Sequence, residues 1–100
     1  MRDCDKINWQ DWELVEENER TLLEKQLRTE IGVAHHLYQA VERLRVIARD
    51  YASDDVLVSD PTVTPQYYVV HLTWSDTPSE NEEFPTFCSV LKSLLPLEYQ

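Results

Sequence analysis

Glycine is almost absent from this chain of 100 residues, cysteine is scarce, and long apolar runs are missing. Each of these absences excludes a class of site or partner. The only glycine is Gly32, whereas phosphate-binding loops need at least two glycines, so such loops are excluded. The two cysteines, Cys4 and Cys88, stand far apart without a Cys-x-x-Cys spacing, which argues against a disulfide framework. No apolar run is long enough to span a bilayer, so we expect no membrane partner.

Basic residues are also scarce, and the formal net charge is -10. Such a charge repels phosphate backbones, so direct nucleic-acid binding is not expected. The acidity is uneven: residues 31–53 are slightly basic because Arg43, Arg45 and Arg49 face only two acids there. The charge favours a basic partner, although acidity alone also keeps a small protein soluble.

The length predicts a single domain over residues 1–100, with frayed ends at 1–8 and 97–100. Acidic residues stand near the start, where a secretory leader needs an apolar run. We therefore expect a cytoplasmic protein whose two cysteines are free thiols.

A long helix is predicted from about Asp11 to Ile31. Asn8 or Asp11 could cap its start, and Gly32 stands where a left-handed C-cap belongs. Its apolar residues fall largely on one helical face: Trp12, Val15, Leu22, Leu23, Leu27 and Ile31.

The stretch from Val33 to Asp50 fits two structures. Its apolar residues recur with helical spacing, but Leu44, Val46 and Ala48 also alternate with arginines as in a strand. The strand alternative gives a hairpin between about residues 42–50 and 55–59, joined by a polar turn. Periodicity by itself slightly favours the helix.

The strongest strand signal runs from Tyr67 to Trp74 and follows a proline-containing loop at residues 60–65. An acidic, mobile loop is expected at 75–83, and then a short helix from about Cys88 to Leu95, which Pro96 ends. Trp12, Trp74 and Tyr68 are expected to belong to the core.

Several short motifs follow one another along the chain: Leu27 to Ile31, Gly32, His36-Leu37-Tyr38, Asp54 to Leu57, Val69 to Trp74, and Pro85-Thr86. In this order they resemble a family of small uncharacterised bacterial proteins. The resemblance covers about residues 23–95, and its most specific part is the run Val69 to Trp74. It implies a strand before Asp54, which favours the hairpin over the helix, and it implies no activity.

Taken together, the patterns predict an α+β fold in the order α-β-β-β-α. A three-stranded antiparallel meander would pack against the long N-terminal helix and the short C-terminal helix. One face of such a sheet stays open to solvent or to a partner. The residues expected on this open face are Arg43, Arg45, Tyr67, Val69 and His71.

The histidines do not have the spacing of a metal site, so no metal or cofactor is expected. We expect His36 to pack beneath Tyr38 and to bond backbone groups. Asp55 could orient His71, and the possible polar cluster is His36, Asp55 and His71. However, Asp54 and Asp55 are also common turn residues, so catalysis has little support.

The leading hypothesis is therefore a non-enzymatic module that binds a protein, or a second copy of itself, through the open sheet face. Aromatic residues and arginine are typical of interface anchors. One alternative is an acidic inhibitor, such as an immunity-type protein, that binds a basic partner. A second alternative is a small enzyme or ligand-binding protein that uses His71 and Asp55.

Overall fold

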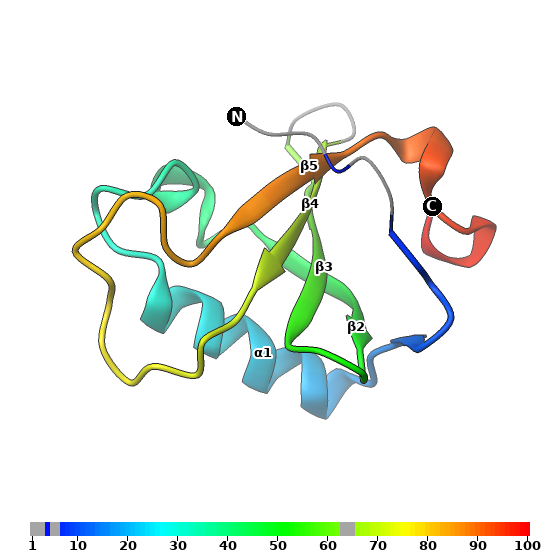
Figure 1. Cartoon of the computed structure of the whole chain (residues 1–100), viewed down its shortest axis with the longest axis horizontal. Helices are drawn as coiled ribbons and strands as arrows, with labels where there is room; N and C mark the ends of the chain where they lie inside the picture. The colour runs from blue at the N-terminus through cyan, green and yellow to red at the C-terminus, as the bar shows by residue number, and fades with distance from the viewer. Residues whose placement is uncertain (1–3, 5–6, 63–65) are drawn as a thin grey trace.

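A computed structural model describes Cys4, residues 7–62 and residues 66–100, and Figure 1 shows its arrangement. One five-stranded antiparallel sheet has the order β1-β2-β3-β4-β5. The predicted mixed α+β class is confirmed. Within the described residues, however, the sheet has five strands where three were expected, and there is one α-helix where two were expected. The strands are β1 (Trp12–Leu14), β2 (Arg45–Asp50), β3 (Asp55–Asp60), β4 (Gln66–His71) and β5 (Phe87–Val90), and the helix is α1 (Glu17–Glu30).

The helix begins later than predicted because the chain before it joins the sheet. Trp12 lies opposite Asp50 in β2, and Leu14 lies opposite Ala48. The spacing of Trp12 and Val15 suggested a helical face, but pairing with the edge of β2 outweighs that local pattern. Neither Asn8 nor Asp11 caps the helix: its N-cap is Glu16, whose side chain makes no capping bond.

The hairpin implied by the resemblance is present as β2 and β3, which pair antiparallel with a bulge between Val46 and Ala48. The helical periodicity of the preceding residues appears only as the 3₁₀ turn η1 (Tyr38–Ala40). β4 follows, pairs with β3, and ends at His71, three residues short of the prediction. The intervening loop falls partly on residues 63–65, which lie outside the described residues.

The C-terminal helix predicted at 88–95 is wrong. Phe87–Val90 forms β5 and pairs with β4, with Val90 opposite Tyr67. The free edge of β4 needs hydrogen-bond partners, and this requirement outweighs the short apolar spacing. Two 3₁₀ turns follow, η2 (Lys92–Leu94) and η3 (Leu97–Tyr99), and Tyr99 is buried although 97–100 was expected to fray.

Both faces of the sheet are covered, which corrects the expected open face. The helix-covered face packs Leu23 and Leu27 of α1 against Val56, Val58 and other strand residues. On the opposite face, residues from both ends of the chain form a second cluster over Leu57 and the two residues expected to be exposed, Tyr67 and Val69, which are buried. This cluster includes Trp12, Leu95 and Tyr99, with Cys4, Ile7 and Trp9 packed against it. We call the parts of the two chain ends that carry these residues the terminal strap. Figure 1 shows them beside the sheet.

The only glycine is needed for close packing and not for a left-handed cap. Ile31 caps the helix in an extended conformation, and Gly32 does not have a positive φ. A Cβ at residue 32 would collide with the Ser79 carbonyl oxygen. Gly32 therefore lets the 75–83 loop lie against the chain at the end of α1.

The expectation of two free thiols is also wrong. Cys4 and Cys88 form a disulfide whose Cα atoms are 5.3 Å apart, and Cys4 N–H donates to Ser89 O at 2.8 Å. The fold brings residues 84 positions apart together, which spacing along the sequence could not indicate. In the described part of the chain, no helix has the length and apolar character needed to cross a membrane.

Candidate functional site

Asp55 and His71 lie directly opposite each other on β3 and β4. His71 Nδ1 is 2.8 Å from Asp55 Oδ1, so the carboxylate orients the ring. Both side chains are substantially exposed. His36 does not complete the cluster, since its ring lies 6.1 Å from that of Phe87, which packs on the helix-covered face.

The buried histidine is His35, and not His36 as expected. Its Nε2 lies 2.8 Å from Pro85 O, and its Nδ1 accepts the Leu37 N–H at 3.0 Å. Burial of the ring lowers the pKa of His35. Its two nitrogens are thus used in holding the 32–38 turn, and within the described residues no group of three His, Cys, Asp or Glu side chains could hold a metal.

The three arginines of the basic middle are each paired with an acid. Arg43 Nη2 lies 2.9 Å from Asp60 Oδ2, and this contact holds the pKa of Asp60 at about 2. Arg45 Nε is 3.5 Å from Glu24 Oε2 on α1. Arg43 and Arg45 therefore do not form a surface with Tyr67 and Val69, which are buried on the other face.

Glu30 is a buried and heavily bonded side chain that the sequence did not single out. It is only 2% exposed, and its two carboxylate oxygens accept four hydrogen bonds. Oε1 accepts Thr73 N–H at 2.8 Å and Thr73 Oγ1 at 2.7 Å. Oε2 accepts Trp74 N–H at 2.9 Å and Gln26 Nε2 at 2.7 Å. A carboxylate at the end of α1 thus fixes the backbone immediately after β4.

Trp74 is the residue that this clamp positions. Its φ is 60°, in the left-handed region that costs a non-glycine residue about 1–2 kcal/mol. Its ring remains exposed, whereas the sequence predicted a core residue. The indole Nε1–H donates to Asp54 Oδ1 at 3.0 Å, which fixes the ring as well as the backbone.

Trp74 belongs to an exposed cluster with Arg49 and Tyr51, which we call the Trp74 surface. The Arg49 guanidinium carbon lies 5.6 Å from the Trp74 ring centre and 5.1 Å from that of Tyr51. Arg49 Nη1 also donates to Glu19 Oε2 at 3.0 Å, and Tyr51 OH donates to Glu19 Oε1 at 2.6 Å. The last bond raises the pKa of Tyr51. A cavity of about 360 Å³ adjoins Trp74 and Arg49 along α1.

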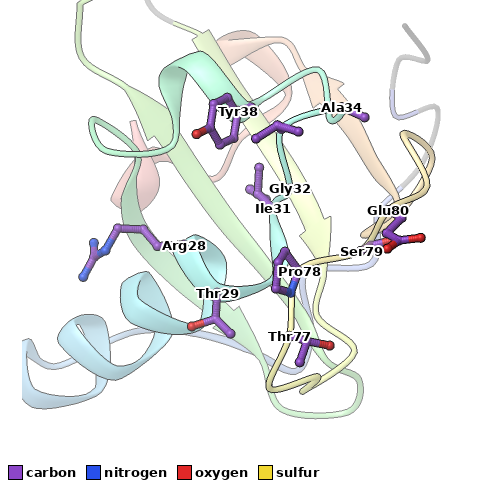
Figure 2. A pocket seen from close by; sticks show the side chains of 11 residues that line it. Arg28, Thr29, Ile31, Gly32, Ala34, Tyr38, Thr77, Pro78, Ser79 and Glu80 are labelled. Carbon is purple, nitrogen blue, oxygen red and sulfur yellow. The ribbon is translucent and has the colours of Figure 1, made fainter.

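A larger groove of about 970 Å³ lies at the end of α1. It is lined by the chain around Gly32 and by residues 77–80 of the 75–83 loop. Figure 2 shows Tyr38 and Arg28 on one side of the groove and Glu80 on the other, with Pro78 between them. The lining combines apolar groups with charged residues at its rims.

One sequence signal could have found Glu30. It lies on the same helical stripe as Leu23 and Leu27, at the spacing i, i+4, i+7, so a carboxylate was placed among core positions. The exposure of Trp74 had no such signal, because its alternation with Tyr68 and Leu72 predicts burial.

Comparison with family models, with curated proteins and with solved structures finds no match to this chain.

Proposed function

We propose that this protein is a non-enzymatic interaction module that binds a basic protein through the Trp74 surface. The observation that carries the proposal is that Trp74 is 47% exposed while its backbone and its indole are both fixed by carboxylates. Large exposed aromatic groups that are ordered before binding lose little entropy on association. This surface replaces the open sheet face as the candidate docking region.

The composition of the Trp74 surface supports an anchor role. Tryptophan, tyrosine and arginine are the residues that most often dominate binding energy at protein interfaces. Tyr51 is 49% exposed, and the nearby Leu22 of α1 is 66% exposed, so apolar area surrounds the central ring. A strained backbone and a buried carboxylate both cost folding free energy, and strained residues cluster at functional sites. Their presence at Trp74 therefore supports a functional role for this residue.

The charge around this surface supports a basic partner. Glu19 and Asp54 contact the cluster directly, and the whole chain carries a net charge of -10. Such a field attracts a positively charged protein and accelerates its association. An acidic inhibitor that neutralises a basic protein is one form of this function.

Affinity purification with the full chain as bait tests the proposal. The variant is Trp74→Asn, because asparagine adopts left-handed backbone conformations more readily than most residues do. We expect at least one basic protein to bind the wild type with an affinity that falls as salt rises. The variant should bind it about 30-fold more weakly, as expected for the loss of an anchor worth about 2 kcal/mol.

Leu97→Ser is the matched control, since Leu97 is an apolar residue that is 87% exposed in the C-terminal turn η3. Its partners and affinities should equal those of the wild type. Circular dichroism and melting temperature establish that both variants fold. A set of retained proteins that is identical for Trp74→Asn and the wild type would refute the proposal.

A further inference from the structure

We propose that the partner contributes a linear, extended segment, which lies in a groove running along α1 from Trp74 to Tyr38. This inference rests on the proposed function and names the kind of partner that the same site accepts. It depends on three observations: two cavities that share a lining residue, the apolar groups along them, and a cation at the groove rim that has no acidic partner within the described residues.

The two cavities are neighbours along one stripe of α1. Thr29 lines both the cavity beside Trp74 and the groove beside Gly32. Leu22, Gln26 and Thr29 have the spacing i, i+4, i+7, which places them on one helical face. The path therefore runs along the helix from the Trp74 surface to the groove.

The opposite wall of the path is fixed to the helix. Gln26 Nε2 donates to Ser75 O at 2.8 Å, and Ser79 N–H donates to Glu30 O at 3.2 Å. Gly32 allows the Ser79 carbonyl to approach closely, as described above. The groove thus has one wall from the helix end and one from the loop, both held in place before a partner binds.

The dimensions suit an extended peptide. Residues 19–29 of α1 cover about 15 Å, because a helix rises about 1.5 Å per residue. An extended chain covers that distance in about five residues, and the groove beyond Thr29 needs a few more. Exposed apolar groups stand at both ends, Leu22 near Trp74 and Val33, which is 80% exposed, beside Tyr38. Alternate side chains of a segment could occupy these positions.

Arg28 indicates the charge of the bound segment at the groove end. Arg43, Arg45 and Arg49 each pair with an acid, whereas within the described residues neither Arg28 nor Lys25, which lines the cavity beside Trp74, makes an ion pair. In a chain this acidic, a cation without an acidic partner at a groove rim favours a carboxylate from outside. The segment should therefore carry an acidic residue opposite Arg28 and a basic one near Glu19 and Asp54.

The test uses a displayed library of random linear peptides of about twelve residues, selected on the intact protein. Enriched peptides are then titrated against Trp74→Asn, Arg28→Glu and Val33→Asp. We expect each substitution to weaken binding about tenfold or more. A peptide in which lysine replaces its acidic residue should bind Arg28→Glu better than it binds the wild type.

Lys92→Glu is the matched control for charge reversal, because it changes the net charge as Arg28→Glu does but lies in the C-terminal turn η2. It should leave the affinity within about twofold. Peptides that need Trp74 but tolerate Arg28→Glu and Val33→Asp would overturn the groove and leave the proposed function intact. So would a library without binders, if a folded basic protein still requires Trp74. If neither a peptide nor a protein partner requires Trp74 for binding, both the groove and the proposed function are overturned.

Discussion

The two faces of the sheet are closed by different means. The helix-covered face buries three ionisable side chains, Glu30, His35 and Asp60, and each is hydrogen-bonded. The terminal strap buries aromatic and aliphatic groups and is joined to β5 by a disulfide. Hydrogen bonds between particular side chains thus help to hold the helix-covered face together, while apolar packing and a disulfide hold the terminal strap on the other face.

Because of this difference, the stability of one side should depend on pH and the stability of the other on redox state. The lowered pKa values of His35 and Asp60 tie the stability of the helix-covered face to pH. The strap depends on the redox state of Cys4 and Cys88, since its contacts with the sheet come from short, irregular segments. The Trp74 surface belongs to the first side, because Glu30 positions it.

The largest expected effect is the loss of the disulfide. The bond closes a loop of 84 residues. Chain-entropy arguments assign a loop of this size about 4–5 kcal/mol of stability. Cys88→Ser should therefore lower the free energy of unfolding by about 4 kcal/mol, measured by urea denaturation. Hydrogen exchange should accelerate at Ser89 and Val90, and not at Thr73 and Trp74.

Reduction of the wild type provides the control for this prediction. A dithiol reductant should reproduce the effect of Cys88→Ser and should leave that variant unchanged. Equal unfolding curves for the oxidised and reduced protein would show that packing alone holds the strap.

The second effect concerns the carboxylate on the helix-covered face. Glu30→Gln keeps the shape but turns an amide donor toward a site where four donors already converge. We expect a loss of about 2 kcal/mol, because buried donors lose their acceptor. Hydrogen exchange at Thr73 and Trp74 should accelerate, while the strap stays protected. Glu17→Gln, at an exposed position in the first turn, should cost below about 0.5 kcal/mol.

The strand that begins near Tyr67 could be predicted from its β-branched and aromatic residues, which are a local signal. The hairpin was predicted only with the help of the resemblance, because periodicity alone slightly favours a helix before Asp50. The strands β1 and β5 could not be predicted in this way. Trp12–Leu14 and Phe87–Val90 are short, and their hydrogen bonds come from partners far along the chain. The face expected to be open is covered by the chain ends, which continue from these two strands and are joined to β5 by the disulfide.

The residues of the candidate site also differ in whether local signals or distant contacts determine their positions. Asp55 and His71 were found together because a hairpin register places neighbouring strands opposite each other. Tyr67 and Val69 were misplaced because their exposure depends on what the chain ends cover. Trp74 was misplaced because β4 ends at His71, and the bend that exposes the indole depends on Glu30, over 40 residues earlier.

The smallest effect should distinguish an ion pair whose carboxylate is buried from an ion pair that is exposed on both sides. The folded pKa of Asp60, about 2, lies below its ordinary value, so the pair with Arg43 contributes stability above about pH 4. That contribution is lost as pH falls through 4 toward 2. Because Arg43 is 42% exposed, solvent screening reduces this contribution to about 1 kcal/mol.

Asp60→Asn should therefore destabilise the protein at pH 6 and have almost no effect near pH 2. Asp55→Asn, which breaks the exposed pair with His71, should change stability by less than about 0.5 kcal/mol at either pH. Equal pH dependence in the two variants would show that burial of Asp60 on the helix-covered face gives it no advantage over a surface pair.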